Sequence, residues 1–157
     1  MSYEIRELKQ NELNVLNTFL YEAIFIPDGV DAPPYEIIKQ PELQVYVTDF
    51  GKQKGDICYV AECDDKIVGA VWVRIMDDYG HVDDETPSFA ISLLKEYRNY
   101  GIGTELMKRM LFELKKQGYK QASLSVQKIK NAVHMYTKVG FNIVNENDEE
   151  YIMVCKL

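Results

Sequence analysis

The stretch of sequence that decides the fold runs from Glu96 to Leu106 and reads EYRNYGIGTEL. It lies between a strand-like run, residues 88–94, and a long segment, residues 102–117, whose apolar residues recur at helical spacing. Gly101 and Gly103 allow a tight turn and leave the backbone open to a ligand. The first N–H groups of the following helix have no partner inside it and carry the positive end of the helix dipole. Such a corner is typical of a site for phosphate oxygens.

Two familiar phosphate-binding motifs do not fit this corner. The dinucleotide fingerprint needs a third glycine where this chain has Leu106, and the Lys-Ser/Thr pair of a nucleoside-triphosphate loop is absent. The corner is therefore expected to bind another phosphate-containing ligand. A site for a nucleotide phosphate and a plain turn without a ligand are the alternatives.

Strand and helix patterns alternate along the rest of the chain. The expected strands are residues 3–8, 57–63, 66–76, 88–94, 122–126, 141–144 and 151–157, and the expected helices are 11–25, part of 35–50, 102–117 and 131–139. This order predicts one α/β domain over residues 1–157, in which helices flank a central, mostly antiparallel mixed sheet.

Two blocks of residues resemble the GNAT superfamily of N-acetyltransferases. Arg98-x-x-Gly101-x-Gly103 after a strand resembles that family's acyl-CoA pyrophosphate loop, and the block AVHMYTKVGF, residues 132–141, is similar to its late helix. The resemblance implies a GNAT-like acyl-CoA N-acyltransferase fold, with acetyl-CoA as the acyl donor and no metal.

The resemblance also assigns roles by position. It implies that the backbone of Ile91, Ser92 and Leu93 pairs with the pantetheine arm, and that Tyr136 protonates the departing thiolate as general acid. The residues implied to hold the pyrophosphate and neighbouring parts of the cofactor are Arg98, Asn99, Tyr100, Gly101, Ile102, Gly103 and Thr104. Ile129 occupies a position where the family often has asparagine, so nearby Asn131 is assigned to the cofactor, although it also suits a helix cap.

Acetylation of an amine needs a base or a desolvating site, because an alkyl ammonium with a pKa of about 10.4 is almost fully protonated at pH 7. The loop 77–85 holds five carboxylates in nine residues and leads into the strand expected beside the thioester. We expect Glu85 to be the base, with Asp84 second and His81 as a further candidate. A solvated acidic turn is the alternative.

The acceptor is expected to contact Phe25, Ile26, Tyr35 and the loop 27–34, since the family's acceptor cleft lies beside the segment that joins its first two helices. The net charge of −7 argues against nucleic-acid and membrane partners and favours a cationic amine, although residues 95–138 carry a local charge of +7. A polyamine, an aminoglycoside-like compound, an amino acid and a protein N-terminus all fit. The resemblance further suggests a homodimer through the final strands.

We therefore hypothesise an N-acetyltransferase in which a primary amine of a small molecule or peptide attacks acetyl-CoA directly. The alternative is an acyl-CoA-binding module that catalyses nothing. Three scattered cysteines predict no disulfide framework and no thiol nucleophile, and no apolar run approaches the ~18 residues of a membrane span. These features predict a cytoplasmic protein.

Overall fold

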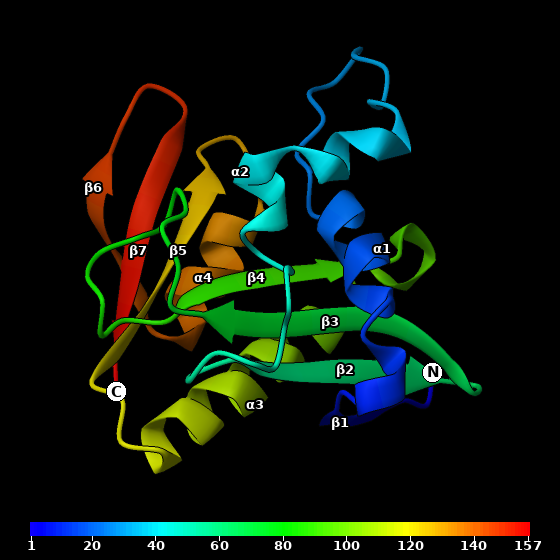
Figure 1. Ribbon diagram of the computed structural model, residues 1–157. Helices are drawn as coiled ribbons and strands as arrows, with labels where there is room; N and C mark the ends of the chain where they lie inside the picture. The colour runs from blue at the N-terminus through cyan, green and yellow to red at the C-terminus, as the bar shows by residue number, and fades with distance from the viewer.

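The computed structural model describes residues 1–157 and contains one seven-stranded sheet with the strand order β1-β2-β3-β4-β5-β7-β6 (Figure 1). The strands are β1 (Glu4–Glu7), β2 (Ile57–Cys63), β3 (Lys66–Arg74), β4 (Ser88–Leu93), β5 (Gln121–Gln127), β6 (Phe141–Glu146) and β7 (Glu150–Lys156). The helices are α1 (Val15–Glu22), α2 (Pro41–Gln44), α3 (Ile102–Lys116) and α4 (Ala132–Val139), with 3-10 turns at Gln10–Glu12, Tyr35–Lys39 and Lys95–Tyr97. The expected mixed α/β fold is confirmed.

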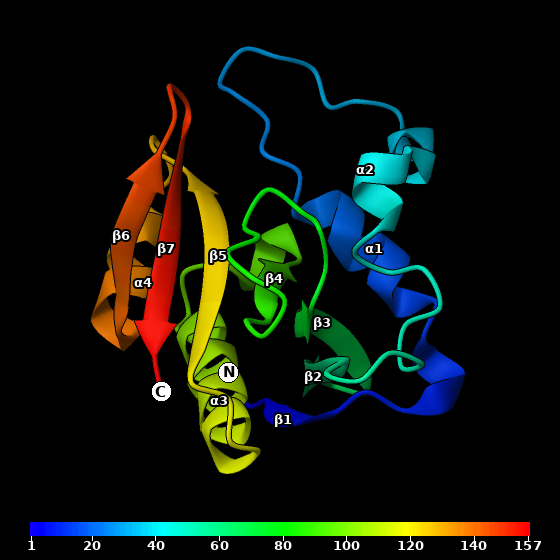
Figure 2. The same cartoon turned by 60° about the vertical axis from the view of Figure 1, so that its left-hand side comes forward.

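Two hydrophobic cores cover the two faces of this sheet. The core under α3 and α4 contains Leu106, Met107, Tyr136 and Phe141, and the core under α1 and α2 contains Phe19 and Trp72, among other residues. Figure 2 shows α1 and α2 on the opposite side of the sheet from α3 and α4. None of the four helices has the length and apolar character needed to cross a lipid bilayer.

The first helix is shorter than its apolar spacing predicts. Residues 10–12 form a 3-10 turn instead, because Glu12 is held by the Arg6 guanidinium through two hydrogen bonds of 2.9 and 2.8 Å and also accepts the Lys9 N–H. Arg6 reaches Glu62 on β2 as well, at 2.8 Å. Pro41 is the first residue of α2. Proline is tolerated there because an N–H group at this position would have no acceptor inside the helix.

The strands β4 and β5 form the only parallel pair of the sheet, and they pair at one position, Ser88 opposite Ser123. Beyond it the arrows of β4 and β5 point in different directions (Figure 1). The pairing point is held by side chains: the Ser88 hydroxyl donates to Asp78 at 2.9 Å, and the Ser123 hydroxyl donates to the Gly80 carbonyl at 2.7 Å. The sheet therefore opens into a gap between two strands whose starts are fixed.

A buried ion pair fixes the segment that follows α2. Arg74 and Asp56 have side chains that are 2% and 0% exposed, and two parallel hydrogen bonds of 3.0 and 2.9 Å join them. Arg74 also donates to the Val45 carbonyl at 3.1 Å, and Trp72 on the same strand donates to the Tyr46 carbonyl at 3.1 Å. Strand β3 thus holds residues 45 and 46 by their backbone.

We predict that Arg74→Met destabilises the protein by about 3–5 kcal/mol, because it leaves the Asp56 carboxylate buried without its cation. Urea denaturation followed by circular dichroism measures the change. Lys52→Met serves as the control, because the Lys52–Asp49 pair is exposed and should contribute less than about 0.5 kcal/mol. Equal losses in the two variants would contradict the prediction.

Candidate functional site

Two cavities lie at the gap between β4 and β5. The larger cavity, of about 690 Å³, extends from the end of α1 past β4 to Arg98, Gly103 and the start of α4. The smaller cavity, of about 220 Å³, lies between the gap, Tyr46 after α2 and Tyr79 in the acidic loop. Residues that line both cavities define what we term the junction; they are Ala23, Phe25, Ile91, Lys130 and Tyr136.

The backbone of β4 faces the gap at alternate residues. The Leu94 N–H donates to the Val68 carbonyl on β3. Backbone groups alternate in direction along a strand, so those of Ser92 also point to β3, and those of Ile91 and Leu93 point to the gap. The Ser92 hydroxyl donates to the Phe19 carbonyl at 2.6 Å, so its side chain is engaged with α1. Ile91 and Leu93 therefore suit the expected pairing with an extended ligand, whereas Ser92 does not.

The strand-to-helix turn at residues 99–104, termed the glycine corner, presents a row of free donors. None of its six backbone N–H groups donates a hydrogen bond within the protein, and the first intrahelical bond of α3 runs from Glu105 to Gly101 at 3.2 Å. Positive φ angles at Asn99 (68°) and Gly101 (84°) produce this exposed arrangement. A Cβ atom at Gly103 would lie 3.5 Å from Leu93, so the missing side chain keeps the larger cavity open here.

Arg98 lies beside the glycine corner and has a structural role. Its Nε donates to the Leu93 carbonyl at 3.0 Å, and its Nη2 lies 3.2 Å from the Glu22 carboxylate. The side chain therefore ties the end of β4 to the end of α1 while it lines the larger cavity.

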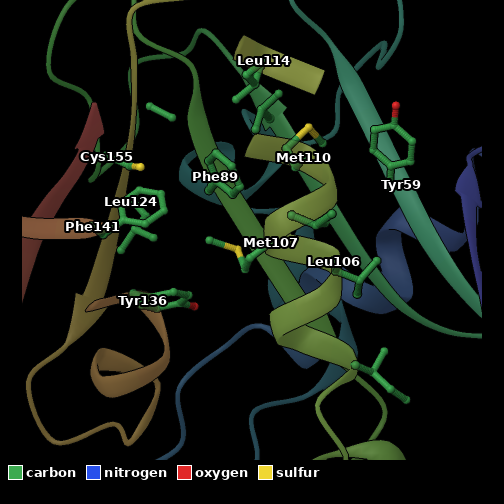
Figure 3. Packing of buried hydrophobic residues seen from close by; sticks show 14 of the residues in the cluster. Tyr59, Phe89, Leu106, Met107, Met110, Leu114, Leu124, Tyr136, Phe141 and Cys155 are labelled. Carbon is green, nitrogen blue, oxygen red and sulfur yellow. The ribbon is translucent and has the colours of Figure 1, made fainter. Parts of the chain in front are cut away.

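Tyr136 connects the core to the junction. Its ring is 8% exposed and packs edge-on against Phe141 with centroids 6.2 Å apart, and Figure 3 shows it reaching from α4 to the core residues around Leu124. Every fully buried side-chain nitrogen or oxygen has a hydrogen-bond partner. The Tyr136 hydroxyl makes no hydrogen bond, so its oxygen is not fully buried and is open to the cavities that the residue lines. Burial raises the Tyr136 pKa to about 12, so the hydroxyl keeps its proton at neutral pH.

The structure does not bring the expected base to the cavities. Glu85 and Asp84 are exposed, and the Glu85 N–H donates to Asp83 at 2.8 Å within a local turn. His81 hydrogen-bonds the Met76 carbonyl at 2.9 Å, and it too lines neither cavity. Gly80 in the same loop lies close to β5, where a Cβ atom would be 3.1 Å from the strand's backbone, and the Gly80 carbonyl accepts a hydrogen bond from the Ser123 hydroxyl.

The expected acceptor residues are only partly together. Phe25 and Ile26 line the larger cavity, and Phe25 belongs to the junction. Tyr35 is exposed and packs against Tyr21 with tilted rings whose centroids lie 5.3 Å apart, and it lines neither cavity. The reason is that residues 35–39 form a 3-10 turn whose buried residue is Ile38.

The turn between β5 and α4 places Asn131 in the larger cavity. Asn131 occupies the cap position of α4, as its sequence position suggests, but its side chain makes no capping hydrogen bond. Ile129 is 76% exposed and lines neither cavity.

Several polar residues of the smaller cavity were not expected. They are Tyr46, Tyr79, Gln127, Lys130 and Glu150. Burial and the neighbouring Asp78 raise the Tyr46 pKa, and burial raises the Asp78 pKa. The only sequence signal was the basic segment that contains Lys130, since the others come together through strand pairing and loop packing.

The cysteine side chains line neither cavity. The three cysteines are free and buried, and burial raises the pKa of both Cys58 and Cys155, which does not favour a thiolate nucleophile. No group of three His, Cys, Asp or Glu side chains lies close enough together to hold a metal ion.

Comparisons with known proteins agree with this geometry. A family model described as an acetyltransferase (GNAT) domain matches residues 54–143, which is more than half of the chain. The chain is 34% identical over 68 residues to a ribosomal protein bS18 alanine N-acetyltransferase of Haemophilus influenzae, covering 43% of this chain and 47% of that protein. It is 33% identical over 84 residues to a probable N-acetyltransferase camello of Xenopus tropicalis, covering 53% and 37%. The matches thus span less than half of these relatives.

Solved structures show the same fold over the whole chain. The PaiA N-acetyltransferase of Thermoplasma acidophilum, solved in complex with coenzyme A, aligns with a TM-score of 0.74 at 19% identity and covers 100% of both chains. A GNAT-family acetyltransferase of Streptococcus pneumoniae aligns with a TM-score of 0.72 at 21% identity over 99% of both. These alignments confirm the expected GNAT fold.

We predict that Gly101→Ala weakens coenzyme A binding about tenfold or more, because a side chain at φ 84° strains the backbone that presents the free N–H groups. Isothermal titration calorimetry measures the affinity. Gly118→Ala is a matched control, since Gly118 ends the same helix with φ 91° and equally open space. Both variants should lose about 1 kcal/mol of stability. Identical coenzyme A affinities in the two variants would remove the glycine corner from the binding site.

Proposed function

Because this chain belongs to the GNAT acetyltransferase family, we propose that it transfers the acetyl group of acetyl-CoA to a primary amine, which attacks the thioester directly while both substrates are bound. One observation carries the proposal: a single cavity extends from Gly103 of the glycine corner, whose N–H group makes no hydrogen bond within the protein, to Tyr136 at the junction.

The residues present suit a long ligand with a diphosphate at one end. The unpaired N–H groups of residues 99–104 and the positive end of the α3 dipole bind phosphate oxygens. The gap-facing N–H and C=O groups of Ile91 and the N–H group of Leu93 bind an extended amide chain as an added strand would, while the Leu93 carbonyl accepts a hydrogen bond from Arg98. Acetyl-CoA, when bound, supplies the thioester that reacts.

Tyr136 is placed to act as the general acid. Its hydroxyl is open to the junction and retains its proton because burial raises the pKa. A phenol in this position donates a proton to a departing thiolate, which makes the thiolate a better leaving group.

The smaller cavity receives the acceptor amine. It meets the larger cavity at the junction, so an amine held there lies beside the Tyr136 hydroxyl. Holding both reactants in place converts a bimolecular reaction into an effectively unimolecular one, and this orientation supplies much of the rate enhancement.

The general base is a separate question, because the expected Glu85 lies in an exposed turn outside both cavities. Its role stays a prediction. Glu85→Gln tests it. If Glu85 is a base that acts through water, the variant loses activity at neutral pH; if Glu85 only belongs to a solvated turn, the variant keeps its activity.

A coenzyme A-binding module without catalysis is the competing function, and release of free thiol from acetyl-CoA distinguishes the two. The assay uses a panel of amino acids, polyamines, aminoglycosides and peptides with free N-termini. Thiol release that depends on one of these amines supports the enzyme. Tight coenzyme A binding without turnover on any of them would support the module instead.

We predict that Tyr136→Phe lowers kcat about 100-fold and leaves coenzyme A affinity nearly unchanged, because it removes the acid but keeps the buried ring. Steady-state kinetics and calorimetry provide the two measurements. Phe112→Leu on the exposed face of α3 is the control and should leave both values unchanged. Turnover of Tyr136→Phe at the parent rate would exclude the acid role.

The pH profile follows from the raised pKa of Tyr136. With a pKa of about 12 the hydroxyl stays protonated from pH 6 to 9, while the acceptor amine progressively loses its proton over that range. We therefore expect kcat/KM to rise continuously between pH 6 and 9, without a falling limb. A decline between pH 8 and 9 in a protein that stays folded would mean that the reaction requires a protonated group with a lower pKa than Tyr136.

A further inference from the structure

Lys130 is a cation at the junction without a counter-ion. It lies on the turn between β5 and α4, is half-buried and lines both cavities. No carboxylate lies within ion-pair distance of its ammonium group, although Glu150 lines the same smaller cavity. The ammonium lies 5.9 Å from the centroid of the Phe25 ring, and burial together with the like charge of Arg98 lowers the Lys130 pKa.

The neighbouring Lys128 differs from Lys130 in this respect. Lys128 lies two residues earlier on the same turn and forms an ion pair with Glu146 at 2.7 Å. The chain therefore provides a carboxylate for one lysine of this turn and none for the lysine that borders the reaction site.

A half-buried charge without a partner is unfavourable, so a ligand is the expected source of the anion at Lys130. The diphosphate of the cofactor is assigned to the glycine corner, and the thioester end of acetyl-CoA, which the proposed function assigns to the junction beside Lys130, carries no charge. The second substrate therefore has to supply the anion.

We propose that the acceptor is an amine with a carboxylate beside the reacting nitrogen, as in an α-amino acid, and that Lys130 binds this carboxylate. This inference rests on the proposed acetyl transfer and selects one class among the amines that fit the sequence. It differs from the expectation of a cationic acceptor, because the unpaired Lys130 ammonium repels an acceptor that carries further positive charge.

The rest of the smaller cavity suits such a molecule. Most of its lining is apolar or aromatic and includes Leu43, Tyr46 and Tyr79 in addition to the junction residues. An amino acid bound with its carboxylate at Lys130 would place its side chain against the apolar and aromatic lining of the smaller cavity. The positive charge also favours the neutral form of the attacking amine, which is the nucleophilic form.

The test compares each α-amino acid with its own α-carboxamide, which keeps the amine and side chain and removes the negative charge. Acetyl transfer is measured for the parent protein and for Lys130→Met, Lys130→Arg and Lys128→Met. We expect the parent to prefer the best amino acid over its carboxamide by about tenfold or more in kcat/KM. Lys130→Met should lose this preference through a raised KM for the acid, while Lys130→Arg and Lys128→Met should keep it. Carboxamides or polyamines used as well as the acids by the parent would overturn the proposal.

Binding gives a readout that does not depend on turnover. Calorimetry compares N-acetylamino acids with N-acetylamino acid amides on the protein loaded with coenzyme A. Tighter binding of the acids that disappears in Lys130→Met supports the proposal, even if no acetyl transfer occurs and the proposed function fails. Equal binding of acids and amides would overturn it, even if the protein acetylates other amines.

Two controls separate recognition from a structural role. Lys130→Met should keep its coenzyme A affinity and should not fall in urea stability, because it replaces an unpaired, half-buried charge by an apolar side chain. A loss of stability, or of coenzyme A binding, equal to the loss of acid preference would assign Lys130 to the fold or to the cofactor and overturn the proposal.

Discussion

The whole site depends on one constraint, which is that β4 and β5 pair at a single position. Ser88 and Ser123 hold the strands together at their starts, and Asp78 and Gly80 fix those serines from the acidic loop. Beyond this point each strand keeps its other partner and turns free backbone groups toward the gap. A continuous sheet would have closed the opening where the two cavities now meet.

The groups proposed to hold the cofactor then belong mainly to the backbone. The glycine corner presents N–H groups, the edge of β4 presents N–H and C=O groups, and Arg98 is occupied with Leu93 and Glu22. The two side chains proposed to take part in the reaction, Tyr136 and Lys130, both lie at the junction.

Local patterns in the sequence predicted every strand and helix and identified the glycine corner, because spacing, glycine and capping residues act within a few positions. They did not predict the site as a whole. Glu85 was expected at the thioester because its loop is acidic, but it lies in an exposed turn in which its N–H donates to Asp83, outside both cavities. Tyr46 and Glu150 reach the smaller cavity through long-range contacts that no short motif encodes. The cytoplasmic location and the homodimer remain predictions.

The way that β3 holds the segment after α2 has an evolutionary consequence. Arg74 and Trp72 hold that segment through the carbonyl oxygens of residues 45 and 46, and every amino acid has a carbonyl oxygen. Side chains on this wall of the smaller cavity can therefore be exchanged without loosening its attachment. Selection can adapt the protein to a new acceptor by point mutation while the half that holds the donor stays intact.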